Sequence, residues 1–186
     1  MTILGISGSL REDSHNTKLL RAAQELVLGD VELTVWDGLK AVPPYDQDDD
    51  RDPAPDGVTA LREALAGADA VLFATPEYNS SIPGVLKNAI DWASRPLATN
   101  VLRNKPVAVI GTSTGMFGAV WAQAELRKVV AATGARVVEG DLPLGQAHTR
   151  FDASGRLVDD DVRVRLAEVV YALVDETIPL PVAAAA

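Results

Sequence analysis

Short apolar runs rich in β-branched residues recur along the chain, and longer segments with apolar residues at helical spacing separate them. This alternation is typical of βαβ units built around a parallel sheet. It predicts strands at residues 2–6, 31–36, 70–75, 107–112 and 136–139. It predicts helices at residues 17–28, 58–66, 84–94, 119–133 and 161–176. The chain is therefore expected to adopt an α/β fold.

Two predicted strands, residues 70–75 and 107–112, are apolar throughout rather than alternating. Strands that are covered on both faces have this composition, so helices are expected on both sides of the sheet. The segments 37–57 and 140–158 are predicted as long loops, which in compact domains commonly form lids, subunit contacts or substrate surfaces. No internal repeat is visible, so residues 1–180 are predicted as a single domain and residues 181–186 as a flexible tail.

Composition restricts the function further. The 186 residues have a net charge of −9 and include no cysteine. A nucleic-acid backbone is held by clustered Lys and Arg, which this chain lacks, so no nucleic-acid partner is predicted. Without cysteine there can be no disulfide, thiolate nucleophile or cysteine-bound metal. Any redox chemistry must therefore come from a bound cofactor.

The aspartate runs at residues 48–50 and 159–161 are interpreted as a solvated loop and a capped helix start, and no metal site is predicted. The chain opens on a strand, without the basic and apolar segments of a signal peptide. No segment approaches the ~20 apolar residues that cross a bilayer. A cytoplasmic protein with no membrane partner is therefore expected.

Ligands of doubly wound sheets bind beyond the carboxyl ends of the strands, so the loops after the first, third and fourth predicted strands are the candidates. The first of them contains Gly8 for a tight turn and short polar side chains at Ser9, Ser14 and Asn16. The helix that follows directs free backbone N–H groups toward the loop. Arg11 adds a charge that can form two parallel hydrogen bonds with a phosphate. The sequence therefore predicts a phosphate site here.

Two other phosphate loops are excluded because neither the Walker motif Gly-x-x-x-x-Gly-Lys-Ser/Thr nor the dinucleotide motif Gly-x-Gly-x-x-Gly is present. A structural role stays open, in which Ser14 or Asn16 only caps the helix. His15 lies in the same loop, but nothing in the spacing requires it to bind. His148, in the segment 140–158, is interpreted as a surface residue.

The loop after the third strand reads Pro76-Glu77-Tyr78-Asn79-Ser80-Ser81-Ile82-Pro83-Gly84. Its prolines fix the backbone, its tyrosine offers an aromatic edge, and its amides can meet the polar rim of a flat heterocycle. The loop after the fourth strand, residues 111–118, combines three glycines with three hydroxyl side chains. Its backbone can therefore approach a ligand closely, although a simple strand-to-helix turn is the alternative.

Together these motifs resemble the NADPH-dependent FMN reductase family. The resemblance rests on Ser9-Leu10-Arg11 with Ser14 and Asn16, and on Pro76 to Gly84 followed by Leu86-Lys87-Asn88-Ala89-Ile90-Asp91-Trp92. The order of predicted elements matches the family over nearly the whole chain. The resemblance implies a flavodoxin-like three-layer fold, in which a five-stranded parallel sheet of order 2-1-3-4-5 has helices on both faces.

The resemblance also implies bound FMN. The positions that would bind its phosphate are Ser9, Arg11, Ser14 and Asn16. The positions that would border its isoalloxazine ring and ribityl chain are Pro76, Glu77, Tyr78, Asn79 and Ser80. Ser113 and Gly115 would meet the flavin ring from the third loop. In this family the helix that carries Trp92 tends to contribute to a dimer interface. A homodimer or homotetramer is therefore implied, and Trp92 is not assigned to flavin stacking.

The leading hypothesis is an oxidoreductase in which NADPH or NADH passes hydride to bound FMN, which then reduces a small acceptor: a quinone, a flavin, an azo compound or chromate. The cofactor supplies this chemistry, so no side chain is predicted to be catalytic. The alternatives are an electron-carrier flavodoxin and a flavin-bound regulatory protein. The carrier is disfavoured because flavodoxin phosphate loops resemble Thr-x-Thr-Gly-x-Thr and have no counterpart to Arg11.

Overall fold

Parallel strands form one sheet in the computed structural model, which describes residues 1–177. The strands are β1 (Thr2–Ser7), β2 (Glu32–Trp36), β3 (Ala70–Thr75), β4 (Pro106–Thr112), β5 (Arg136–Val137) and β6 (Pro143–Leu144). Their order is β2-β1-β3-β4-β5, and β6 also pairs with β4. Every pairing is parallel. This order is the flavodoxin-like one, so the predicted fold class is confirmed. The predicted tail at 181–186 lies outside the described residues.

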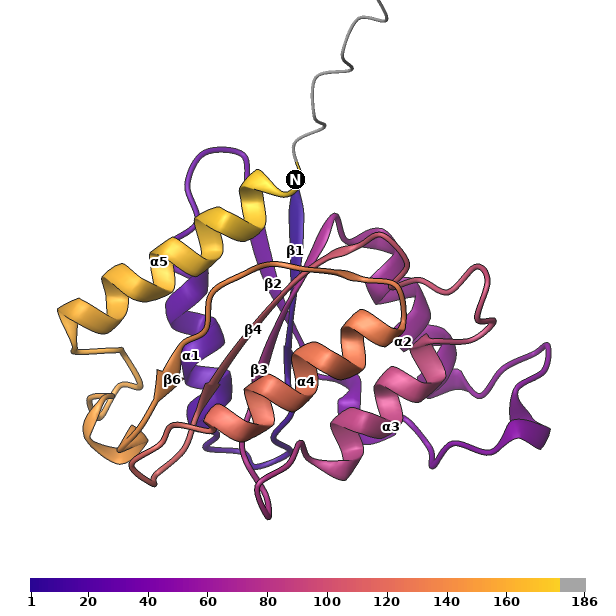
Figure 1. Ribbon diagram of the computed structural model, residues 1–186, viewed down its shortest axis with the longest axis horizontal. Coiled ribbons are helices and arrows are strands. Elements are labelled where there is room, and N and C mark those ends of the chain that lie inside the picture. The colour runs from indigo at the N-terminus through magenta and orange to yellow at the C-terminus, as the bar shows by residue number, and fades with distance from the viewer. Residues whose placement is uncertain (178–186) are drawn as a thin grey trace, which may run out of the picture.

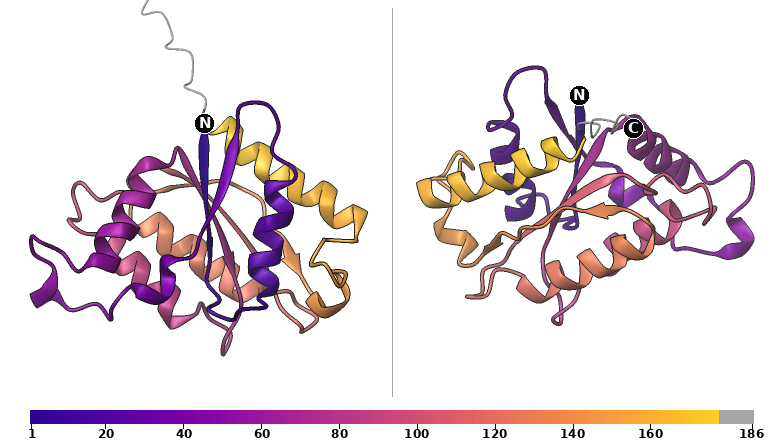
Figure 2. Two further views of the ribbon diagram at one scale, coloured as in Figure 1. Left: turned by 180° about the vertical axis from the view of Figure 1, so that it is seen from behind. Right: turned by 45° about the horizontal axis from the view of Figure 1, so that its top comes forward.

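Helices cover both faces of the sheet. They are α1 (His15–Gln24), α2 (Asp56–Gly67), α3 (Gly84–Ala93), α4 (Val120–Ala132) and α5 (Asp160–Asp175). Two of them, α1 and α5, lie on one face, and α2, α3 and α4 lie on the other (Figure 1, Figure 2). The first helix ends at Gln24 rather than at the predicted Leu28, which is 67% exposed. Extending the helix that far would therefore gain no packing. No helix in residues 1–177 is long and apolar enough to span a bilayer.

Strand residues alternate between two cores, one for each helix layer. In β3, Val71 and Phe73 pack with α2, α3 and α4, whereas Leu72 packs with α1 and α5. The same period-two alternation separates Val109 from Ile110 in β4. Because both faces of these strands are buried, the continuous apolar runs are explained, and the strands hold the loops at their ends in fixed positions.

The fifth strand position is interrupted, which corrects two predictions. Of the predicted strand 136–139 only Arg136–Val137 pairs, and the predicted loop 140–158 contains β6 and a short 3-10 helix, Ala147–Thr149. Side chains of α4 replace the missing strand hydrogen bonds. Arg127 donates to the carbonyls of Val138 and Val109, and Gln123 both donates to the Leu142 carbonyl and accepts from the Leu142 N–H. These polar side chains satisfy backbone groups that the break would otherwise leave unpaired.

The long segment between β2 and α2 is a structured cover over α3 rather than an open loop. It contains two 3-10 helices, Gly38–Ala41 and Gln47–Asp49. Asn88 accepts from the Tyr45 N–H and donates to the Pro43 carbonyl, which also accepts from the Trp92 indole. Trp92 is fully buried and meets Tyr45 edge to face. Within this chain Trp92 is therefore a core residue.

Candidate functional site

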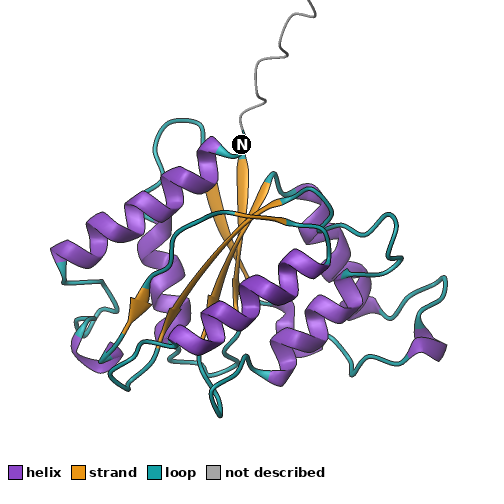
Figure 3. Ribbon diagram, in the orientation of Figure 1, coloured by secondary structure: helices purple, strands orange, loops and turns teal. Residues whose placement is uncertain are grey.

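All three candidate loops lie at the carboxyl edge of the sheet. In Figure 1, β1 begins at the marked N-terminus and runs downward, so its carboxyl end and those of the other parallel strands face the lower edge. Figure 3 shows loops collecting there. The edge is the position at which doubly wound sheets bind ligands.

The first loop passes close to the second because Gly8 has no side chain. A Cβ on Gly8 would lie 2.9 Å from Cδ2 of Leu86 and 3.2 Å from Cδ of Pro76. The Gly8 N–H donates to the carbonyl of Ala74 at the end of β3, 2.8 Å away. This glycine therefore lets the first loop turn directly beside the second.

The first loop ends on the amino terminus of α1. Ser14 caps the helix, and its hydroxyl accepts from the Thr17 N–H at 3.3 Å. The N–H groups of His15 and Asn16 have no acceptor within the helix, because they belong to its first turn. The first turn contains no acidic residue. This end of α1 can therefore receive an anion.

Two cations stand beside this helix end. The Arg11 guanidinium is more than half exposed and donates to the Asp13 carbonyl, with its Nε at 2.9 Å. Lys18 Nζ pairs with the Asp13 carboxylate at 2.5 Å, and this contact holds the Asp13 pKa below its ordinary value. The same guanidinium lies 3.8 Å from the Asp13 carboxylate, so it must exchange its bonds to Asp13 for bonds to a ligand that binds here.

Asn16 connects the first loop to the end of β4. Its side chain is buried, its Oδ1 accepts from the Thr112 N–H at 3.0 Å, and its Nδ2 donates to the Thr112 carbonyl at 3.1 Å. Both ends of the amide are thus occupied by backbone. The side chain of Asn16 is therefore not available to a phosphate, and the backbone N–H is the group of Asn16 that could meet one.

The second loop is a tight turn between Tyr78 and Ser81, whose backbones exchange two hydrogen bonds at 3.0 and 3.1 Å. Its central residues, Asn79 and Ser80, have φ values of 53° and 61°. Positive φ at both positions is the geometry of a type I′ turn, which Asn adopts readily. The turn leaves Tyr78 54% exposed beside the cleft.

Glu77 ties this second loop to α4. Its Oε2 accepts from the N–H groups of Trp121 and Ala122, both at 3.1 Å. The residue before the helix, Ala119, has no side-chain cap to offer, so Glu77 satisfies donors that would otherwise lack a partner. Ser81 adds a bond of 2.5 Å to Glu125. The Glu77 carboxylate thus positions the loop.

The third loop is hydrogen-bonded to β6 and to the segment that follows it. The Ser113 N–H donates to Leu144, and the carbonyls of Ser113 and Gly115 accept from Ala147 and Gln146. Beyond these bonds the loop presents apolar side chains: Met116 is 78% exposed and Phe117 61% exposed. Its hydroxyl end therefore faces the cleft while its apolar tip forms part of the surface.

Eight of the eleven predicted site residues line one cleft of about 170 Å³. They are Ser9, Arg11, Ser14, Asn16, Pro76, Glu77, Tyr78 and Ser113. The other three, Asn79, Ser80 and Gly115, do not line it. Three lining residues were not predicted: His15, Thr112 and Thr114. The two threonines flank Ser113, so the hydroxyl pattern of the third loop could have indicated them, whereas His15 had no sequence signal beyond its place in the first loop.

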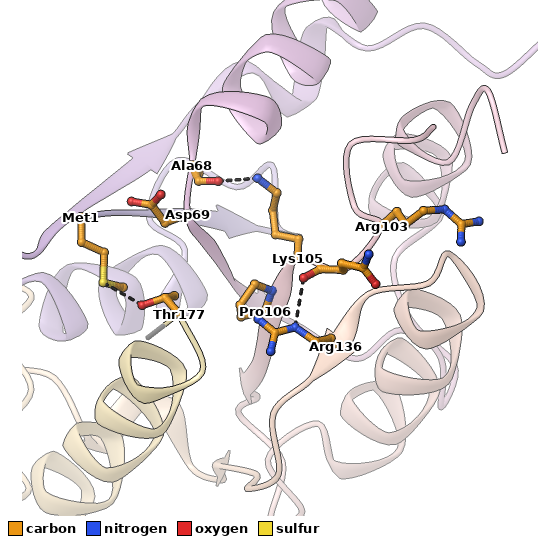
Figure 4. A pocket seen from close by; sticks show the side chains of 9 residues that line it. Met1, Ala68, Asp69, Arg103, Lys105, Pro106, Arg136 and Thr177 are labelled. Carbon is orange, nitrogen blue, oxygen red and sulfur yellow. Dashed lines mark hydrogen bonds between the residues drawn. The ribbon is translucent and has the colours of Figure 1, made fainter. Parts of the chain in front are cut away.

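A larger cavity of about 620 Å³ lies at the opposite edge of the sheet (Figure 4). Its cations are already bound to the protein. Lys105 donates to the carbonyls of Leu65 and Ala68, and burial lowers its pKa. Arg136 donates to the side chain and carbonyl of Glu176. Because these groups support the fold, the smaller cleft is the better candidate site.

The structure is therefore that of a doubly wound α/β protein whose cleft is lined by the start of α1, by Arg11 and by Tyr78. The NADPH-dependent FMN reductase family model matches residues 1–149, and the chain belongs to this family. It is 41% identical over 172 residues to an NAD(P)H-dependent FMN reductase of Pseudomonas aeruginosa, with 92% of each chain covered. It is also 41% identical to a 2-hydroxy-1,4-benzoquinone reductase of a Burkholderia species, with 88% of each covered.

A solved structure supports the same assignment. The flavoenzyme FerB of Paracoccus denitrificans, an NAD(P)H:(acceptor) oxidoreductase, is 40% identical and superposes with a TM-score of 0.83. The match covers 95% of this chain and 96% of that one. The residues of the cleft suit a flavin phosphate, since the free N–H groups at the start of α1 supply donors and the Arg11 guanidinium supplies positive charge.

Proposed function

We propose that the chain is an FMN-dependent NAD(P)H oxidoreductase whose cofactor phosphate binds at the end of α1. Ser9, Arg11, Ser14 and the N–H groups of the first turn would hold the phosphate. The observation that supports this most directly is the cleft itself, which joins that anion site to the polar backbone of the second and third loops.

The remaining predicted residues would border the flavin ring. Tyr78 and the backbone of Pro76 and Glu77 line the same cleft, and Ser113 faces them from the third loop. Asn79, Ser80 and Gly115 do not line the cleft, but each is a near neighbour in sequence of a residue that does. Their contribution is proposed to be the shape of the two loops, through the turn geometry of Asn79 and Ser80 and the backbone bond of Gly115.

When bound, FMN supplies hydride transfer from a nicotinamide to a small acceptor, which needs no side-chain acid or base. The chain's own residues bind and orient the cofactor. Arg11 balances phosphate charge, and Glu77 holds the second loop in place. A quinone is the proposed acceptor class, because the similar Burkholderia protein is named as a benzoquinone reductase. A cytoplasmic location stays a prediction of the sequence.

Mixing the FMN-loaded protein with NADPH or NADH under nitrogen tests the activity. We expect rapid loss of the visible flavin absorbance, followed by its recovery when a benzoquinone is added. Bound flavin that keeps its absorbance in the presence of both nicotinamides would instead support an electron carrier of the flavodoxin type. A chain that binds no FMN would contradict the proposal itself.

The proposed assembly is a homodimer formed through the apolar rim of the cleft. Phe117 and Trp121 lie edge to face at 5.1 Å and are 61% and 49% exposed, and Met116, the neighbour of Phe117 in the chain, is 78% exposed. Exposed apolar residues that gather beside a site are typical of an interaction surface. A homotetramer, made from two such dimers, is the larger assembly that the sequence resemblance also implies.

Light scattering tests the assembly. We expect a dimer or tetramer for the natural chain, and a lower mass for Phe117→Asp, because the change places a charge in the rim. Val164→Asp is the matched control, since Val164 is 60% exposed on α5, on the other face of the sheet. A natural chain that scatters as a monomer, or equal masses for the three proteins, would contradict the proposed interface.

A further inference from the structure

His15 occupies an unusual place in the cleft. It is the first residue of α1, and its ring lies against Phe151 at 5.8 Å with an interplanar angle of 16°. Among the described residues, its Nδ1 is the one buried side-chain nitrogen or oxygen without a hydrogen-bond partner. Because His15 lines the cleft and Nδ1 is enclosed, Nε2 is the nitrogen that a ligand can reach.

The charges around this ring are mostly positive. Arg11 in the first loop, Lys18 on α1 and His148 on the 3-10 helix all disfavour protonation of His15, and Asp13 alone favours it. Burial disfavours the charged form most strongly, so the pKa of His15 lies below its ordinary value. In the free protein the ring is therefore neutral near pH 7.

A phosphate at the end of α1 would reverse this balance. An anion within a few ångströms of an imidazole favours the charged form and raises its pKa. The same anion also pairs with Arg11. The positive charge of Arg11 is then balanced by the phosphate, and its effect on the His15 ring becomes weaker. An imidazolium can also donate a charge-assisted hydrogen bond from Nε2, which is stronger than the bond from a neutral ring.

We propose that His15 binds the FMN phosphate through Nε2 in its protonated form and takes up protons from the solvent when the cofactor binds, which makes FMN affinity depend on pH. The inference rests on the proposed function. Its sign follows from linkage: the contribution of His15 is full below the pKa of the free protein and is lost as the pH rises through the higher pKa of the complex. His15 is thus a binding residue that holds a proton, and it takes no part in hydride transfer.

The direct test is to titrate the two histidines of the chain by NMR, in the protein alone, with FMN and with riboflavin, which lacks the phosphate. We expect the pKa of His15 to rise by about one unit or more with FMN and to stay unchanged with riboflavin. His15→Gln removes the His15 signal and so assigns the two signals. An equal shift with both flavins, or none with FMN, would overturn the inference.

A second test measures the dissociation constant of FMN from about pH 5 to pH 8 for the natural chain and His15→Gln. The phosphate itself titrates near pH 6, which weakens binding in acid for both proteins, so only their ratio is informative. If the pKa of His15 rises by one unit, the dissociation constant of His15→Gln should exceed that of the natural chain by about tenfold at the acid end. The two constants should become nearly equal at the basic end.

The possible failures are distinguishable. Should FMN bind tightly with a ratio that is constant across the pH range, the inference on His15 is wrong and the proposed function stands. If FMN does not bind, or binds no better than riboflavin, the phosphate site itself is wrong. His15→Phe, which keeps an aromatic ring against Phe151, separates the loss of stacking from the loss of the titrating nitrogen.

Discussion

Replacing Arg11 with alanine is expected to weaken FMN binding by about ten- to a hundredfold and to leave riboflavin binding unchanged. A hydrogen bond to a charged group contributes about 1.5–3 kcal/mol, and each 1.4 kcal/mol is a factor of about ten in affinity. Arg11 is 58% exposed and gives up its bond to the Asp13 carbonyl when it turns to a ligand. Both facts place the expected loss in the lower part of this range.

Two variants control for other effects of the change. Arg21→Ala removes the same charge from the opposite end of α1, where the side chain is exposed, and should bind FMN as the natural chain does. Arg11→Lys keeps the charge but loses the planar pair of donors, and should recover part of the affinity. Fluorescence titration with both flavins measures all four proteins. An Arg11→Ala titration indistinguishable from that of Arg21→Ala would refute the phosphate assignment.

Periodicity was enough to predict the first four strands and the presence of the five helices, because strands that are buried on both faces need continuous apolar runs. Residues 70–75 and 107–112 show this clearly, and the structure has strands at Ala70–Thr75 and Pro106–Thr112. The fifth strand was harder to predict. Its break depends on Gln123 and Arg127, which lie on α4 and supply hydrogen bonds that no local pattern in residues 136–144 can indicate.

The site shows the same division. Arg11 and Ser14 could be predicted as cleft residues from the sequence, since both belong to the loop that follows the first strand. Contacts between different loops could not be predicted from the sequence. Glu77 reads as a ligand-facing residue, yet its carboxylate caps α4, 44 and 45 residues along the chain. His15 acquires its enclosed nitrogen only because Phe151 packs against it from a distant segment.

Asn16→Ala is expected to lower the free energy of unfolding by about 2–4 kcal/mol. The change removes two buried hydrogen bonds and leaves the N–H and the carbonyl of Thr112 without their partner. An unsatisfied buried polar group costs about 1–3 kcal/mol, and water that enters the site recovers part of this. Urea unfolding of the protein without cofactor measures the loss.

Ser14→Ala is the matched control, because it removes the cap of the same helix and should cost only about 1 kcal/mol.

The binding of the two flavins also distinguishes the role of Asn16 from that of Arg11. Asn16 joins the first loop to the end of β4, so its loss lets the two walls of the cleft move apart. FMN and riboflavin should therefore both bind more weakly to Asn16→Ala, whereas Arg11→Ala should affect FMN alone. A stability loss no larger than that of Ser14→Ala, with riboflavin binding intact, would show that the Asn16 amide does not hold the two loops together.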